Sequence, residues 1–190
     1  MILRRRLLNK GQITVVIALT LAWQVSCRHE VRQQRIPVLL LTSSSFSADT
    51  IPAKYGCRGQ NTSPEISWNS APAGTQTFVL LVTDKDAHSG SESGPFVHWV
   101  LFNISGDKRE LPEGIPPQPK LPDGSFQGRN DFENIGYGGP CPPGGATHRY
   151  AFALYALDSK LNLSAGATEE QVEKAMEGHI LARGEIIASY

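Results

Sequence analysis

Four runs of mostly apolar residues limit the folds that this sequence can adopt more than any other feature. They span residues 78–83, 96–104, 150–157 and 183–189, have the length of β-strands, and are rich in β-branched and aromatic side chains. An apolar run without alternating polar residues is typical of a strand that is buried on both faces. We therefore expect a mainly β protein, with a further strand at 38–42.

One segment has the pattern of an amphipathic helix. Thr168 can cap its N-terminus, and Gln171, three residues later, completes a capping box. Val172 and Met176 then fall on one face. The sequence predicts a helix over Glu169–Glu177 that packs on the sheet.

The segment between Ile104 and Tyr137 is long and has little regular pattern. It contains prolines at positions 112, 116, 117, 119 and 122. A segment of this length inside a domain is usually functional or disordered. The prolines, together with Phe126 and Phe132, favour an ordered loop that wraps around the sheet.

The first 27 residues are typical of an export signal. Four basic residues precede an apolar run at 13–23, which has the length of a signal-peptide core and is too short to span a bilayer comfortably. Cys27 occupies the place of the lipidated cysteine of a bacterial lipoprotein signal, although Gln24 replaces the usual aliphatic residue. A lipid anchor and a plain cleaved signal both stay open, and both predict an exported protein, either membrane-anchored or periplasmic or secreted.

The remaining chain has the size of one domain. The sequence has 190 residues, of which 40% are hydrophobic, and we expect the domain at 37–190 after a polar linker at 28–36. The formal net charge is zero, but setting aside the first 27 residues leaves 14 basic against 18 acidic residues. A mildly acidic domain without a basic run gives little support to nucleic-acid binding.

Cys57 and Cys141 are the cysteines that remain once Cys27 is set aside. An even number of cysteines in an exported protein predicts a disulfide between them, and two separate buried thiols are the alternative. The sequence has no C-x-x-C pair and its histidines are scattered, so the cysteines give no sign of a metal site.

Polar residues interrupt the apolar pattern at strand ends. Asp84, Lys85 and Asp86 follow the first run directly, and two carboxylates at this spacing can orient a histidine, hold a cation or cap a turn. His98 lies inside the second run, where a lone histidine is more often a satisfied core residue than a ligand.

The stretch from Gly136 to Tyr150 is rich in glycine and proline. At its end, His148 and Tyr150 would share one face of a strand, and Arg149 would point to the other. Glycine lets the backbone approach a ligand closely, and proline fixes a loop before binding. Together with His98, this stretch supplies two imidazoles and backbone N–H groups, which form the kind of small site that binds phosphate or carboxylate.

The residue types argue against catalysis. A nucleophile elbow needs serine at the centre of its motif, where the segment 90–94 has Glu92. The pair Pro140-Cys141 lacks the second cysteine and the His-x-Glu partner of a zinc deaminase. Two histidines and two acids holding a metal ion form the less favoured alternative, so we expect no cofactor.

Several motifs together resemble the phosphatidylethanolamine-binding protein family, and within it the bacterial Raf-kinase-inhibitor-like branch. In family order, they are Asn61–Trp68, Asp84–Asp86, Phe96–Val100, Gln127–Phe132 and Gly136–Tyr150. The resemblance runs from about Leu40 to the C-terminus. It implies a large central sheet, antiparallel for the most part, with a smaller sheet packed on it and one or two flanking helices.

The resemblance also implies a site. Asp84 and Asp86 match the acidic loop of the family, His98 and His148 match the two histidines of its anion pocket, and the backbone of 139–142 matches one wall. The predicted ligand-binding residues are Asp84, Asp86, His98, Gly139, Pro140, His148 and Tyr150. Where the acidic motif of the family has prolines, this sequence has Lys85 and His88. We therefore expect a less rigid loop and a cation, Lys85, near the pocket mouth.

The sequence thus predicts an exported, non-enzymatic protein that binds a small anion, such as phosphate, a phosphorylated headgroup or a carboxylate, between two histidines. The alternative is a protein-interaction module that inhibits a protease or kinase, with 106–134 as the surface that contacts its protein partner. Membrane association is expected only through a lipid anchor on Cys27.

Overall fold

The structure of the protein is a computed structural model that describes residues 36–69, 71–88 and 94–190. The predicted export signal with Cys27, and the linker up to residue 35, lie outside the described residues. From Ile36 onward, the described residues belong to one compact unit.

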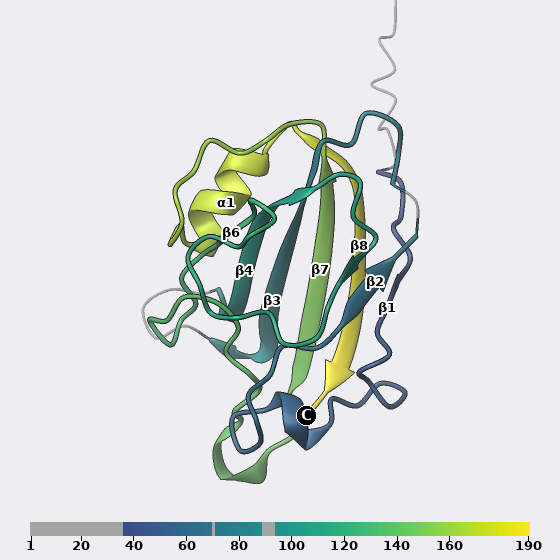
Figure 1. The fold of residues 1–190 in the computed structure, drawn as a ribbon. Helices are drawn as coiled ribbons and strands as arrows, with labels where there is room; N and C mark the ends of the chain where they lie inside the picture. Colours follow the sequence, from purple (N-terminus) through teal and green to yellow (C-terminus); the bar gives the residue numbers. More distant parts are fainter. Residues whose placement is uncertain (1–35, 70, 89–93) are drawn as a thin grey trace, which may run out of the picture. The chain divides into compact units, whose positions relative to one another are not determined.

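A five-stranded antiparallel sheet forms the centre of the fold, with the strand order β6-β4-β3-β7-β8 (Figure 1). Its strands are β3 (Thr77–His88), β4 (Pro95–Ser105), β6 (Phe126–Gln127), β7 (Arg149–Leu157) and β8 (Ile180–Ser189). The four long strands contain the four apolar runs, as predicted, and the strands extend beyond those runs.

Both faces of the central sheet are buried, because side chains alternate along each strand and both sets are apolar. In β3, Phe78, Leu80 and Val82 point into one core cluster, while Val79 and Leu81 point into a second. All five side chains are at most 2% exposed. The continuous apolar run is therefore explained by a strand whose two faces pack into two different core clusters.

A smaller antiparallel sheet with the order β1-β2-β5 covers the first cluster. Its strands are β1 (Leu41–Thr42), β2 (Ile66–Trp68) and β5 (Glu110–Leu111). The strand predicted at 38–42 is therefore shorter than expected. Val38 forms only an isolated bridge with Arg183, and the backbone N–H of Leu39 donates to the Arg183 carbonyl, before the chain turns to β2. The segment divides its hydrogen bonds between two sheets, which leaves two residues in a regular ladder.

Helix α1 (Glu169–Met176) begins at the predicted capping box. The Thr168 hydroxyl accepts from the backbone N–H of Gln171 at 3.3 Å, and the Gln171 side-chain oxygen accepts from the backbone N–H of Thr168 at 3.0 Å. Val172 and Met176 pack into the second core cluster. The helix ends one residue before the predicted end, because the next residue leaves the helical region with ψ of 127°.

The segment 104–137 is ordered and contains more regular structure than predicted. Its strands β5 and β6 have two residues each, too few to show an alternating pattern. Gln127 of β6 is fully buried: its Nε2 donates to the carbonyls of Pro116 and Gln118 at 2.7 and 2.9 Å, and its Oε1 accepts from Trp99 Nε1 at 2.8 Å. One side chain thus ties the proline-rich part of the segment to β4.

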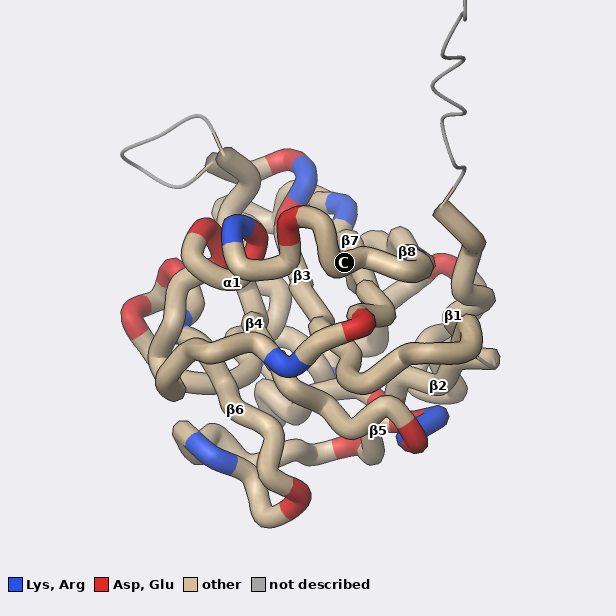
Figure 2. The backbone as a smooth tube through the Cα atoms, turned by 90° about the horizontal axis from the view of Figure 1, so that it is seen from above, with Lys and Arg blue, Asp and Glu red and all other residues tan. Residues whose placement is uncertain are grey.

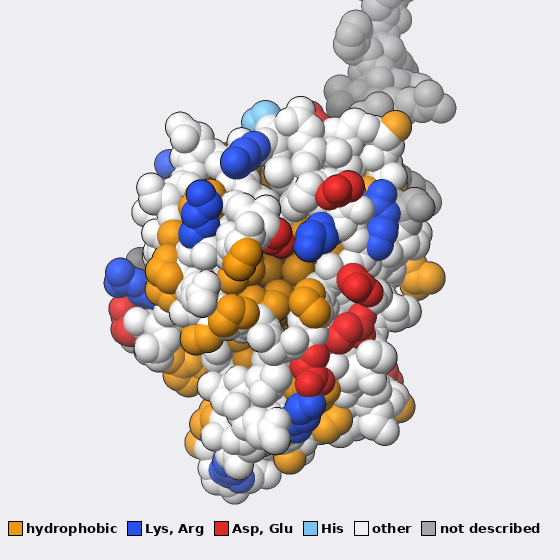
Figure 3. Space-filling view, viewed as in Figure 1, with side chains coloured by type: hydrophobic (Ala, Val, Ile, Leu, Met, Phe, Trp, Pro, Cys, Tyr) orange, Lys and Arg blue, Asp and Glu red, His pale blue; other side chains and the backbone are white. Residues whose placement is uncertain are grey.

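The surface mixes charge and apolar character. Basic and acidic residues are interspersed along the backbone in Figure 2. On the face shown in Figure 3, apolar side chains gather in a hollowed area, and charged side chains of both signs border it. Within residues 36–69, 71–88 and 94–190, no helix combines the length and apolar character that a membrane crossing needs.

Replacing Gln127 with leucine tests the role of this buried amide. Gln127→Leu keeps the approximate volume but removes the acceptor of the Trp99 N–H and the side-chain donor to the Gln118 carbonyl, so the free energy of unfolding should fall by about 2 kcal/mol or more. Urea denaturation measures the change. The matched control is Gln118→Leu, because the Gln118 side chain is exposed. A loss no larger than that of the control would contradict the assigned role.

Candidate functional site

Three neighbouring strands bring the predicted acid and histidines together at one end of the central sheet. In the register of β3, Asp84 lies opposite Phe96 of β4 and opposite Tyr150 of β7. His98 follows two residues after Phe96, and His148 two residues before Tyr150. A pocket of about 200 Å³ opens there; it is lined by Asp84, Ala87, Phe96, His98, Phe132, Cys141, Pro142, Pro143 and His148. We call it the histidine pocket.

The Asp84 carboxylate holds His148 in place. It is 3% exposed, and both of its oxygens have partners: Oδ1 accepts from the backbone N–H of Asp86 at 2.9 Å, and Oδ2 lies 2.7 Å from His148 Nδ1. A carboxylate oxygen accepts, so His148 Nδ1 carries the proton. This leaves Nε2 as the imidazole nitrogen that can meet a ligand.

His98 is held by backbone and by aromatic rings. Its Nδ1 donates to the Gly138 carbonyl at 2.6 Å, and the side chain is 2% exposed. The rings of Phe96, Phe132 and Tyr150 have their centroids 5.1 to 5.2 Å from the imidazole centroid. Burial lowers the pKa of His98 below its usual value of 6.5, against the opposing effect of the Gly138 carbonyl. At neutral pH, His98 is therefore a neutral imidazole whose Nε2 is an acceptor.

Asp86 lies beside the histidine pocket but does not line it. Its carboxylate accepts from Arg149 Nη2 at 2.6 Å, Arg149 Nε at 3.0 Å and the Arg149 backbone N–H at 2.8 Å. The Arg149 side chain lowers the pKa of Asp86 to about 2. Lys85, the cation expected near the pocket mouth, is not among the lining residues and pairs with Glu185 of β8 at 3.7 Å.

Tyr150 supports the site by packing against His98. Its side chain is fully buried, and its ring packs edge-on against the His98 imidazole at 89°. Burial raises the pKa of its hydroxyl well above the usual value of 10. Within the described part of the chain, this hydroxyl has no hydrogen-bond partner. Tyr150 is therefore a neutral support for His98 that is not among the lining residues.

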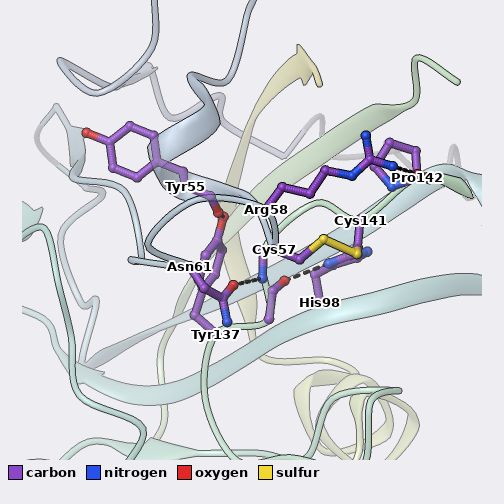
Figure 4. Close-up of a disulfide and its surroundings, with 10 residues drawn as sticks. Tyr55, Cys57, Arg58, Asn61, His98, Tyr137, Cys141 and Pro142 are labelled. Atoms are coloured by element: carbon purple, nitrogen blue, oxygen red, sulfur yellow. Dashed lines mark hydrogen bonds between the residues drawn. A yellow bond between two sulfur atoms is a disulfide. The ribbon is translucent and has the colours of Figure 1, made fainter. Parts of the chain in front are cut away.

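The glycine-proline loop is fastened to the chain by the predicted disulfide (Figure 4). Cys57 and Cys141 are bonded, which closes a loop with a sequence separation of 84. The Cys57 backbone N–H donates to the Pro140 carbonyl at 2.9 Å, and the Gly139 backbone N–H donates to Asn61 Oδ1 at 2.7 Å. These bonds fix the loop that supplies Cys141 to the pocket.

Two glycines of this loop are required by close contacts. A Cβ on Gly138 would lie 2.6 Å from a ring carbon of Phe132. A Cβ on Gly139 would lie 2.2 Å from the Tyr55 carbonyl and 2.6 Å from Asn61 Oδ1. The glycines thus allow the loop to pack tightly against its neighbours.

A second pocket, of about 560 Å³, lies on the other side of the same backbone. Gly139, one of the predicted ligand-binding residues, lines this larger pocket, and Pro140 lines neither of the two. Within the described residues, no cluster of three or more histidine, cysteine or acidic side chains is arranged to hold a metal ion.

Phe132 lines the histidine pocket but was not among the predicted ligand-binding residues. It comes from the long segment, and the neighbouring Asp131 brings it to the pocket: the Val97 N–H donates to Asp131 Oδ2 at 2.8 Å, and the Asp131 N–H donates to the Val97 carbonyl at 3.0 Å. The family motif Gln127–Phe132 was the signal that could have marked it.

The fold and the site together define a mainly β protein of two antiparallel sheets, with a histidine–carboxylate pocket at one end of the central sheet. The chain belongs to the phosphatidylethanolamine-binding protein family, whose model matches residues 42–190.

Similar proteins come from bacteria and archaea. A UPF0098 protein of Methanothermobacter thermautotrophicus is 47% identical over 140 residues, which cover 74% of this chain and 89% of the relative. The crystal structure of a phosphatidylethanolamine-binding protein homolog from Chlamydia trachomatis is 40% identical, with a TM-score of 0.71 over 80% of this chain and 97% of that one. Escherichia coli YbcL is 33% identical, with a TM-score of 0.69 and the same coverage. These likenesses confirm the predicted family, its bacterial branch and the mainly β fold.

Removing the disulfide should destabilise the protein. A cross-link that closes a loop of this length stabilises the folded state by about 2–5 kcal/mol, mainly by restricting the unfolded chain. The double variant Cys57→Ser/Cys141→Ser should lose that amount in urea denaturation, and the unmodified protein should lose a similar amount when a reductant is added. An unfolding midpoint that does not respond to the reductant would contradict a bonded pair.

Burial of His98 should make stability depend on pH in a defined direction. The folded state lowers the pKa of His98, so the unfolded state binds more protons below about pH 6.5. Its contribution to stability is therefore present above that pH and is lost as the pH falls. Histidine NMR should show His98 titrating below 6.5, and the loss of stability between pH 7 and 5 should be smaller in His98→Leu. A titration at or above 6.5 would contradict the burial argument.

Proposed function

We propose that this protein is an exported, non-enzymatic binding protein that takes a small anionic group, such as phosphate, a phosphomonoester headgroup or a carboxylate, into the histidine pocket. The observation that carries the proposal is the pairing of His98 and His148 in one pocket of about 200 Å³. Each imidazole has its Nδ1 committed to the protein, to Gly138 and Asp84 respectively.

The state of these imidazoles defines how an anion would bind. When Nδ1 carries the proton of a neutral imidazole, Nε2 is a lone-pair acceptor and repels a bare anion. An anion must therefore bring a proton, as a phosphate monoanion does, or the imidazole must take one up. The buried Asp84 carboxylate compensates a positive charge on His148, whereas His98 has a backbone carbonyl in that place. We assign the proton uptake to His148.

The size of the histidine pocket favours a headgroup over a whole ligand. Its volume of about 200 Å³ is below the roughly 300–1,000 Å³ typical of pockets that enclose a drug-sized molecule. The aromatic walls from Phe96 and Phe132 exclude water around the bound group and strengthen its hydrogen bonds.

The lining of the histidine pocket supports binding over catalysis. The His148–Asp84 pair has the form of a base with its orienting carboxylate, which needs a nucleophile to act on. Among the described lining residues there is no serine or threonine, and the Cys141 sulfur is committed to the disulfide. We assign the His–Asp pair to anion binding.

Export is part of the proposal. A disulfide persists in an oxidising compartment, and the Cys57–Cys141 bond therefore agrees with the export signal read from the first 27 residues. Cys27 would supply a lipid anchor if it is acylated, and mass spectrometry of the native protein tests that modification directly.

Anion binding should depend on the imidazole proton. Sulfate brings no proton near neutral pH, so calorimetry should show tighter binding at pH 6 than at pH 8. Phosphate should bind at both pH values, because it still carries a proton at each of them.

His148→Ala should weaken phosphate binding about tenfold or more, because a hydrogen bond to a charged group is lost. The matched control is His179→Ala: this exposed histidine pairs with Asp158 at 2.8 Å, outside the pocket. Equal affinities in the two variants would remove His148 from the site, and no binding of either anion would overturn the proposed function.

A further inference from the structure

The larger pocket, of about 560 Å³, has no role in the proposed function. It is lined by Cys57, Asn61, Pro117, Asn130, Phe132, Asn134, Ile135, Tyr137, Gly138 and Gly139. Its volume lies inside the range of about 300–1,000 Å³ that encloses small molecules in proteins. The larger pocket is therefore big enough to bind part of a ligand whose anionic group lies in the histidine pocket.

The two pockets share walls. Phe132 lines both of them, with its side chain 39% exposed although the residue is aromatic. The Gly138-Gly139 backbone separates them: the Gly138 carbonyl accepts from His98, and the Gly139 N–H donates to Asn61. His98 and Asn61 approach this backbone from different directions (Figure 4). Phe132 is the residue common to both linings, so a ligand that extends from the histidine pocket along this ring would meet the larger pocket.

The disulfide joins the same two walls. Cys57 lines the larger pocket, and Cys141 lines the histidine pocket. Because these residues are bonded to each other, the pockets are held at a fixed separation. A fixed separation suits a ligand with two distinct parts.

The larger pocket has a different chemistry from the histidine pocket. Among the residues that the structure describes, no charged side chain lines it. The rings of Phe132 and Tyr137 and the side chains of Pro117 and Ile135 supply apolar surface. The Asn130 amide is used within the fold, since its Nδ2 donates to the Gly136 carbonyl at 2.9 Å and its Oδ1 accepts from two backbone N–H groups. An uncharged, largely apolar group is therefore favoured there.

We propose that the site is bipartite: the anionic group of a small monoester lies in the histidine pocket, and its single uncharged, apolar body lies across Phe132 in the larger pocket. This inference rests on the proposed function and adds the class of ligand. The volume of the larger pocket suits one small body, as in a short alkyl or aryl phosphate.

The experiment compares two probes that share a headgroup. Methyl phosphate lacks an apolar chain long enough to reach the larger pocket, whereas n-hexyl phosphate has one. The difference between their dissociation constants therefore measures binding of the chain in the larger pocket. Burial of part of the hexyl chain should make hexyl phosphate bind at least about tenfold tighter in calorimetry. Equal dissociation constants would overturn the bipartite site and leave the anion pocket standing. No binding of either probe would overturn both proposals.

Two variants test whether the apolar part of the ligand binds in the larger pocket. Ile135→Trp and the more exposed Asn134→Trp each place bulk in the larger pocket, and either should remove the advantage of hexyl phosphate while methyl phosphate binds as before. The matched control is Ser164→Trp, which adds the same bulk to a separate groove of about 500 Å³ beside α1. The advantage should persist in this control. If it persists in both pocket variants that fold, the body lies elsewhere and the inference is wrong; its loss in the control would likewise contradict it.

Discussion

The buried carboxylate of Asp84 is the group on which the site depends. Burial of an ionisable group without partners is costly, and Asp84, in the second half of β3, is nearly inaccessible. The fold supplies two donors, the backbone N–H of Asp86 and the imidazole of His148. These two hydrogen bonds fix the backbone of β3 at Asp86, set the tautomer of His148 and place its free nitrogen at the pocket. A structural requirement of the sheet thus also produces the chemistry of the site.

His98 is also buried, but its hydrogen-bond partner is a backbone carbonyl and not a charged side chain. Within the described part of the chain, no carboxylate is hydrogen-bonded to it, and its Nδ1 donates instead to the Gly138 carbonyl. The same hydrogen bond that satisfies the imidazole fixes the backbone between the two pockets. The two histidines therefore differ in function: His148 can accept a proton beside a compensating charge, whereas His98 stays neutral and positions the wall.

Much of the fold could be predicted because the long strands are apolar on both faces, and β3 serves two core clusters. Strands β5 and β6 were not predicted, since two residues cannot show a period. In the site, the family motifs pointed to Asp84, His98 and His148, which the structure brings together. The sequence could not place Asp86, because its position depends on the Arg149 side chain, or Phe132, because Asp131 holds it against β4 from a distant part of the chain. The alternative of an inhibitory interaction module stays a prediction.

The glycine-proline loop explains why the site needs a cross-link. Glycine loses more conformational entropy on folding than any other residue, so a glycine-rich wall is costly to order. A Cβ at Gly139 would clash with the Tyr55 backbone carbonyl, and a Cβ at Gly138 would require the Phe132 ring to move. The prolines of the loop and the Cys57–Cys141 bond offset this cost, because both restrict the unfolded chain. The oxidised disulfide thus stabilises the loop that lines both pockets, which links the stability of the site to the compartment proposed for the protein.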